Sequence, residues 1–182
     1  MNSIHITRTT KSNIDDIDFN NLGFGTVFSD HMLVCDYKDG NWGTPEILPY
    51  QAISLMPSSK IFHYGQSIFE GMKAYKDTNN QTWLFRPEEN LKRFNLSAKR
   101  LAIPELPKEV FIEGLKALLK VDEKWIPTQD GSSLYIRPII FATGEGFHAS
   151  PANAYKFIIC TAPSGAYFAG KVKVLICLLY TS

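Results

Sequence analysis

SSLYIRPIIFAT, residues 132–143, opens the part of the sequence that decides the fold class, and YKFIICTAP (155–163) and KVKVLIC (171–177) follow it. All three runs are rich in β-branched and aromatic residues, which favour strands. Two predicted helices separate these runs from earlier predicted strands, and the connections among the strands have hairpin lengths. This order favours an α+β domain over a parallel doubly wound sheet, in which strands and helices alternate.

Strands are also predicted before the helices. Residues 26–37 mix β-branched, aromatic and aliphatic side chains, and Asp39-Gly40 tolerates the positive φ of a hairpin turn, so a second strand is expected within 43–50. A short helix is expected around 67–71. A further hairpin is expected within 73–85, because two strand-like runs there flank the polar turn DTNNQ.

Two amphipathic helices are predicted between the two groups of strands. The first begins near Pro87 with acidic residues in its first turn, and it has an apolar stripe formed by Leu91, Phe94, Ala98 and Leu101. Arg93 lies off that stripe. The second helix opens at Pro107, ends near 125–127 and buries five apolar residues: Val110, Phe111, Leu115, Leu118 and Leu119.

Composition limits the possible functions. The 182 residues are 45% hydrophobic and 20% charged with a net charge of +1, so a sizeable core is expected and nothing favours a nucleic-acid or anionic-membrane partner. Aromatic residues reach 13%, which favours an aromatic-lined pocket for a small molecule. Cys35, Cys160 and Cys177 form no close pair and the four histidines lie far apart, so we predict no disulfide framework, no metal site and a cytoplasmic location. No apolar run approaches the ~18 residues of a membrane span.

A tyrosine and an arginine on one predicted strand form a candidate binding pair. Tyr135 and Arg137 are two residues apart, so they project to the same face of the strand. A phenol and a guanidinium can hold a carboxylate between them. The spacing alone leaves open that Arg137 is a surface residue at a strand edge, and that Arg93 and Arg100 are solvated residues of a helix face.

Five longer stretches carry a resemblance to a known family: FGTVFSDHMLV (24–34), HYGQSIFEGMKAYK (63–76), LFRPEENLKRFNLSAKRL (84–101), SLYIRPIIFATGEGFHASP (133–151) and APSGAYFAG (162–170). They resemble the branched-chain-amino-acid aminotransferases, pyridoxal-phosphate enzymes of fold type IV, and cover most of residues 24–176 in the family's order. The resemblance implies the small N-terminal α+β domain of the D-amino-acid-aminotransferase-like fold, followed by the first strands of the large domain. It also implies a homodimer.

The resemblance implies a role for each matching residue. Arg93 matches the residue that binds the phosphate of the cofactor, pyridoxal 5'-phosphate. Four residues match walls of the pocket for the branched side chain: Phe24, Tyr64, Phe69 and Tyr167. Tyr135 matches a residue near the substrate α-carboxylate, and Arg137 matches the group that receives the distal carboxylate of glutamate or 2-oxoglutarate. Two residues match a loop that reaches into the neighbouring subunit's site: Phe147 and Ala149.

The reaction implied is amino transfer from leucine, isoleucine or valine to 2-oxoglutarate. In the family, the Schiff-base lysine lies in a glycine-rich segment after the strand that KVKVLIC resembles, and this sequence contains no such segment. We therefore expect a fragment that lacks the catalytic lysine and is inactive as it stands. The expected organisation is an N-terminal arm (1–22), the small domain (23–163), an interdomain segment with the start of the large domain (164–176) and a non-native tail, CLLYTS (177–182).

Two alternatives to this interpretation stay open. The first is another fold type IV enzyme, a D-amino-acid aminotransferase or an aminodeoxychorismate lyase, although the YIRP stretch and residues 63–76 differ from those relatives. The second is a non-catalytic dimerisation or binding module, for which the missing lysine segment is the support.

Overall fold

The computed structural model describes residues 4–166 and residue 173. The described strands form one sheet in the order β1-β4-β2-β9-β8-β6-β7, with β3 paired to β2 and β5 paired to β8. The strands are β1 (His5–Ile6), β2 (His31–Lys38), β3 (Asn41–Trp42), β4 (Glu46–Pro49), β5 (Ser67–Phe69), β6 (Met72–Lys76), β7 (Thr82–Leu84), β8 (Ser133–Ala142) and β9 (Tyr155–Ser164). The helices are α1 (Lys60–Tyr64), α2 (Pro87–Arg100) and α3 (Lys108–Val121), with 3-10 turns η1 (Ile14–Asp16) and η2 (Glu123–Trp125).

Antiparallel pairing dominates the sheet. β1 pairs with β4 in parallel, and the other described strand pairs are antiparallel. The two longest strands, β8 and β9, pair along their whole length, from Ser133 opposite Ser164 to Ala142 opposite Tyr155. The α+β prediction is therefore confirmed. Among the described residues, no helix is long and apolar enough to cross a membrane.

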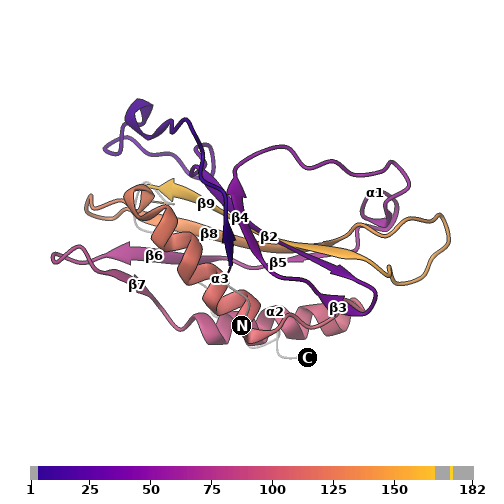
Figure 1. Ribbon diagram of the computed structural model, residues 1–182. Coiled ribbons are helices and arrows are strands. Elements are labelled where there is room, and N and C mark those ends of the chain that lie inside the picture. The colour runs from indigo at the N-terminus through magenta and orange to yellow at the C-terminus, as the bar shows by residue number, and fades with distance from the viewer. Residues whose placement is uncertain (1–3, 167–172, 174–182) are drawn as a thin grey trace.

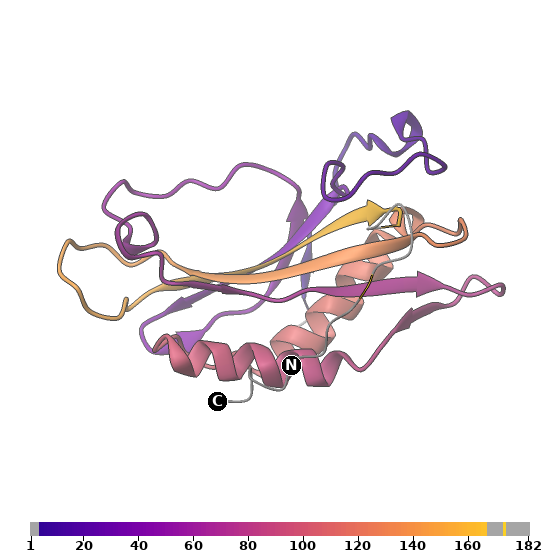
Figure 2. The same ribbon diagram turned by 180° about the vertical axis from the view of Figure 1, so that it is seen from behind.

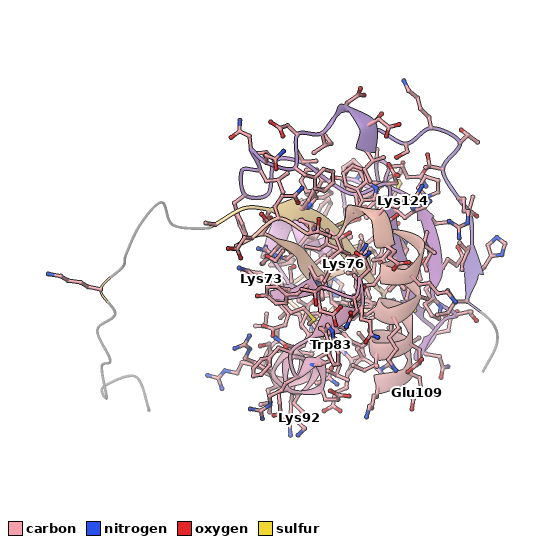
Figure 3. The ribbon with its side chains drawn as sticks, turned by 90° about the vertical axis from the view of Figure 1, so that its left-hand side faces the viewer. Lys73, Lys76, Trp83, Lys92, Glu109 and Lys124 are labelled. Carbon is pink, nitrogen blue, oxygen red and sulfur yellow. The ribbon has the colours of Figure 1, made fainter. Side chains whose placement is uncertain are left out.

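Helices α2 and α3 cover one face of the sheet, and the view from behind shows the strands in front of them (Figures 1 and 2). In Figure 3, Glu109 and Lys124 mark the two ends of the stretch that runs through α3 into η2 alongside the sheet. The centre of the core is a group of three rings, Phe94 of α2, Phe111 of α3 and Phe157 of β9, whose centroids lie 6.0–6.1 Å apart. Neither of the two long helices lies against the opposite face of the sheet.

The two long helices are the elements that hydrophobic periodicity predicts best. α2 begins with Pro87 and acidic first-turn residues, and its buried stripe contains Leu91, Phe94 and Ala98. Leu101 was predicted to continue the stripe, and this is wrong: it is the residue after the last helical turn, and 43% of it is exposed. α3 buries all five of its predicted apolar residues.

The first predicted hairpin forms between β2 and β3. Asp39 and Gly40 have the positive φ angles expected, 51° and 82°, and Tyr37 pairs with Trp42. The strand predicted at 26–37 begins later, at His31, where pairing with β4 starts. The single strand predicted within 43–50 is replaced by β3 before it and β4 at its end, because Pro45 has no N–H to donate to a ladder.

The short helix predicted at 67–71 is wrong. The helix, α1, ends earlier, at Tyr64, because Gly65 adopts the left-handed conformation at its C-terminus (φ 61°). The chain from Ser67 to Phe69 is instead strand β5, which pairs with the end of β8. The hairpin predicted within 73–85 is confirmed as β6 and β7.

Some predictions fall outside the described residues. These are Tyr167, the tail at 177–182 and, apart from Lys173, the strand at 171–177. The domain boundaries at 23–163 and 164–176 stay predictions. The expected arm at 1–22 contributes β1, which lies at the edge of the sheet beside β4.

Candidate functional site

The candidate site lies on the face of the sheet turned away from α2 and α3. On β8, Leu134 and Ile136 belong to the helix-covered core, so the alternating residues Tyr135 and Arg137 project from the other face. A hollow of about 430 Å³ opens there, lined by Phe24, Gly25, Phe28, Tyr135, Arg137, Cys160, Thr161 and Ala162. The predicted pair therefore shares one face and lines one hollow.

Arg137 and Tyr135 are joined directly. The Nε and Nη2 groups of Arg137 donate to the Tyr135 hydroxyl oxygen over 3.1 and 2.7 Å. Because the phenol oxygen accepts both bonds, the Tyr135 O–H proton stays available to a third group, and the guanidinium keeps three of its five N–H donors. The pair thus offers four N–H and O–H donors, a suitable arrangement for an oxyanion such as a carboxylate.

Aromatic rings surround this donor pair. The guanidinium carbon of Arg137 lies 4.4 Å from the ring centroid of Phe69, a cation–π distance, and the Phe24 ring meets Tyr135 edge-on at 4.9 Å. Phe69 is 63% exposed because it lies on the open face of β5, while its neighbour Ile68 faces the core. Apolar walls and oxyanion donors are therefore side by side.

Gly71 makes room for the Tyr135 hydroxyl. A Cβ atom at position 71 would lie 2.6 Å from the Tyr135 oxygen, which is closer than any ordinary contact. β6 pairs with β8 so that Lys73 lies opposite Tyr135, and this register brings the Gly71 backbone to the phenol. A side chain at position 71 would therefore force the Tyr135 hydroxyl to move.

Arg93 is held by a buried carboxylate. Its Nη2 lies 2.7 Å from both oxygens of Glu70 and its Nε lies 3.1 Å from one of them, while Asn90 donates to the other over 2.6 Å. The Glu70 side chain is 8% exposed and that of Arg93 is 68% exposed. The hydrogen bonds and charge of Glu70 raise the pKa of Arg93. The Nε and Nη2 side of the Arg93 guanidinium is thus fixed by Glu70, while the side chain as a whole stays accessible to a ligand.

Phe69 links Arg93 to the Tyr135–Arg137 pair. A second hollow of about 500 Å³ contains Phe69, Arg93 and Arg100 in its lining, and the same Phe69 ring contacts Arg137. The predicted site residues Phe24, Phe69, Tyr135 and Arg137 are therefore joined in one chain of contacts, and Arg93 lies on the other side of Phe69.

Tyr64, Phe147 and Ala149 form a separate group. The Tyr64 hydroxyl donates to the backbone oxygen of Phe147, whose ring lies 5.0 Å from that of His63. Phe147 is 73% exposed and Ala149 is exposed as well. Tyr64 is not among the described residues that line the hollow at Tyr135. Tyr64 is therefore not a wall of this hollow, and its predicted role as a pocket wall concerns another surface.

Sequence reasoning missed several residues of this arrangement, of which Glu70, Gly71 and Cys160 matter most for its geometry. Glu70 is an acidic residue within the apolar stretch SIFEGM, a signal of a buried carboxylate that needs a partner. Gly71 gives no signal without the β6–β8 register. Cys160 faces Arg137 across the β8–β9 ladder, and burial raises its pKa to about 11, so its thiol stays protonated at neutral pH.

Comparison with known proteins relates this arrangement to a class of enzymes. No family model matches the chain. The structure is similar to that of the branched-chain aminotransferase from Thermoproteus uzoniensis solved with norvaline, with a TM-score of 0.59 and 20% identity over 76% of this chain and 43% of that one. It is also similar to the T.th. branched-chain amino acid aminotransferase solved with pyridoxamine 5'-phosphate, with a TM-score of 0.51 and 26% identity over 75% and 41%. The chain thus has the architecture of the fold type IV aminotransferases.

Curated relatives define the family. The chain is 49% identical to the branched-chain-amino-acid aminotransferase of Mycolicibacterium smegmatis over 155 residues, 84% of this chain and 42% of that protein. It is 44% identical to branched-chain-amino-acid aminotransferase 2 of Bacillus subtilis over 171 residues, 93% of this chain and 46% of that protein. The chain is homologous to these branched-chain-amino-acid aminotransferases over the shared residues, and it spans less than half the length of these two relatives.

Proposed function

We propose that this chain is the small domain of a transaminase that moves the amino group of leucine, isoleucine or valine to 2-oxoglutarate, with pyridoxal 5'-phosphate as cofactor. The names of the relatives and the norvaline and pyridoxamine 5'-phosphate of the similar structures support the substrate class and the cofactor. The observation that carries the proposal is the donor pair of Arg137 and Tyr135 set against the exposed ring of Phe69.

Arg93 fits the phosphate of the cofactor. The Nε and Nη2 groups of Arg93 donate three hydrogen bonds to Glu70, which holds the guanidinium plane, and the two N–H donors of Nη1, on an exposed side chain that lines open hollows, take part in none of these bonds. A phosphate offers several oxygens that accept such donors two at a time. When bound, pyridoxal phosphate supplies the carbonyl that exchanges the amino group and a ring that withdraws electrons from the α-carbon. In this proposal Arg93 holds the phosphate, and Glu70 and Asn90 keep Arg93 in place.

The hollow beside Tyr135 fits two kinds of substrate side chain. The rings of Phe24 and Phe28 in its lining, with the exposed ring of Phe69 beside Arg137, offer apolar surface to the branched chain of leucine, isoleucine or valine. The three spare N–H donors of Arg137 offer a partner to the distal carboxylate of 2-oxoglutarate, and the Tyr135 O–H offers a donor to the α-carboxylate. Both kinds of substrate can therefore use this one hollow.

The rest of the proposal concerns assembly. A homodimer would bring Phe147 and Ala149 of one copy to the site of the other, which agrees with the exposure of both residues. Tyr64 would then line a site that the two copies build together, because its hydroxyl is bonded to the Phe147 backbone. Tyr167 is proposed as a further wall on the strength of the resemblance alone. The cytoplasmic location that the cysteine pattern predicts is part of the proposal.

The test is a transamination assay of the gene product that contains this chain, with Arg137→Met as the variant. We expect the KM for 2-oxoglutarate to rise about 10- to 100-fold, the effect of losing one hydrogen bond to a charged group. We expect the KM for leucine to change less than about threefold, because an apolar side chain makes no use of the charge. Lys116→Met on the exposed side of α3, 61% exposed, is the matched control. An equal loss for both substrates, or no turnover of branched-chain amino acids by the parent, contradicts the proposal.

A further inference from the structure

Lys60 carries a buried positive charge that the proposed reaction does not use. The residue is 3% exposed and begins α1. Its ammonium donates to the Ser150 hydroxyl over 2.6 Å, the Ser150 carbonyl over 2.9 Å and the Pro151 carbonyl over 3.5 Å. Within the described residues no carboxylate lies at ion-pair distance from it. The three oxygens match the three N–H donors of the ammonium, so the charge is compensated by the connection between β8 and β9.

The backbone of residues 58–60 holds the part of the β8–β9 connection that directly follows β8. The Lys60 N–H donates to the Gly144 carbonyl over 2.9 Å, and the Gly146 N–H donates to the Ser58 carbonyl over 3.0 Å. Ser59 and Glu145 form an isolated antiparallel bridge beside these bonds. Just after β8, the connection is therefore held by backbone hydrogen bonds to residues 58–60. Just before β9, it is held by the ammonium group of Lys60.

The part of the connection between these two attachments carries Phe147 and Ala149. Figures 1 and 2 both show α1 against the connection between β8 and β9, away from the long helices. Phe147 projects from it, 73% exposed, with its backbone oxygen held by Tyr64 and one ring edge against His63. The shape of this tip therefore depends on the two attachments behind it.

We propose that Lys60 is a positioning residue, whose buried ammonium fixes residues 144–151 in the shape that presents Phe147 and Ala149 to the site of a second copy. A neutral side chain in its place leaves the oxygens of Ser150 and Pro151 without their donor and the return half of the connection without its attachment. The functional consequence rests on the proposed function, and the attachment itself rests on the contacts above.

The first measurement is amide hydrogen exchange across residues 144–152 in the gene product that contains this chain, taken as the parent, and in its Lys60→Met and Lys60→Arg variants. Lys60→Met keeps the apolar stem and removes the donors, so exchange in this segment should rise at least about tenfold while amides of β8 and β9 keep their protection. Lys60→Arg keeps a charged donor group and should restore most of the protection. Lys116→Met, which removes an exposed ammonium, should change nothing there. Unchanged exchange in Lys60→Met overturns the proposal.

A smaller change decides the question if Lys60→Met does not fold. Ser150→Ala removes one exposed hydroxyl acceptor and leaves both carbonyls, so exchange should rise by about two- to fivefold in residues 144–152 only. No rise in that variant overturns the proposal as well.

The second measurement separates positioning from plain stability in the transamination assay. Lys60→Met should raise the KM for leucine about tenfold and leave kcat within about threefold, and Lys60→Arg should return KM toward that of the parent. Raised exchange with an unchanged KM overturns the positioning role and leaves the proposed reaction intact. A parent protein without transaminase activity contradicts the proposed function, and the exchange result still decides the attachment.

Discussion

The buried pair formed by His31 and Asp122 joins distant segments of the chain, and we expect its removal to destabilise the fold strongly. His31 begins β2 and Asp122 follows the last residue of α3, and they are 4% and 2% exposed. The His31 Nδ1 lies 2.6 Å from one carboxylate oxygen, and the His31 backbone N–H donates to the other over 3.0 Å. The Thr9 N–H donates to Nε2 over 2.9 Å, so the imidazole carries its proton on Nδ1. One carboxylate therefore joins α3, β2 and the N-terminal arm.

Replacing Asp122 by alanine leaves two buried donors of His31 without an acceptor. Each unsatisfied donor costs about 1–3 kcal/mol, so the two together cost about 2–6 kcal/mol. Burial raises the pKa of Asp122, which means that the ionised carboxylate is itself partly opposed by its surroundings, so we expect the lower end of that range. The free energy of unfolding should fall by about 3 kcal/mol and Tm by roughly 6–12 °C for a chain of this size.

Urea unfolding of the parent and of Asp122→Ala measures this difference. Glu113→Ala is the control, because Glu113 pairs with Lys116 on the exposed side of α3, where 46% and 61% of the side chains are accessible, and should stay within ~0.5 kcal/mol of the parent. A loss below about 1 kcal/mol for Asp122→Ala refutes the reasoning. A nitrogen-detected spectrum that places the His31 proton on Nε2 refutes the hydrogen-bond assignment on which it rests.

Three further results are expected. Gly71→Ala should displace the Tyr135 hydroxyl, because a Cβ at position 71 would lie 2.6 Å from its oxygen. The ultraviolet difference spectrum of that phenol should change, while unfolding remains cooperative. An unchanged spectrum contradicts the close approach. The Trp83 indole and backbone N–H groups lower the pKa of Asp77. The ionised carboxylate should therefore stabilise the β6–β7 turn above the unfolded pKa of 3.8, and this contribution should disappear as pH falls through the lower pKa of the folded state. Carbon-detected titration of Asp77 measures the folded pKa, and a midpoint above 3.8 contradicts the prediction. Phe94→Ala, at a residue 1% exposed, should lower the free energy of unfolding by about 3–5 kcal/mol in urea, and a loss under about 1 kcal/mol contradicts the core packing.

Local patterns in the sequence predict the long helices and most strands of this fold. α2 and α3 follow from apolar spacing and first-turn residues, which act within one helix. The segment at 67–71 shows where such patterns fail, because α1 ends at Gly65 and the following residues gain their hydrogen bonds from β8, far away in sequence. Pairing between distant segments is invisible to a pattern read along one of them.

The candidate site divides in the same way. Tyr135 and Arg137 share a face because side chains alternate along a strand, and this much follows from their spacing. That Phe69 covers Arg137 depends on β5 pairing with β8, and that Glu70 holds Arg93 depends on α2 lying against the end of that strand. The roles assigned by resemblance thus name the residues, and the tertiary register determines which of them touch.

The two arginines of the site differ in what holds them, and the difference agrees with the two different ligands proposed for them. Arg93 is bonded to a carboxylate, so its positive charge is largely offset and its binding of a ligand depends on the direction of the two N–H donors of Nη1. Arg137 is bonded to a neutral phenol and an aromatic ring, so its positive charge is kept. A group that stays in place through many turnovers, as a cofactor phosphate does, is well served by fixed geometry. A carboxylate that enters and leaves in each cycle is better served by an uncompensated charge beside an apolar wall, because the same wall then accepts a side chain that carries no charge.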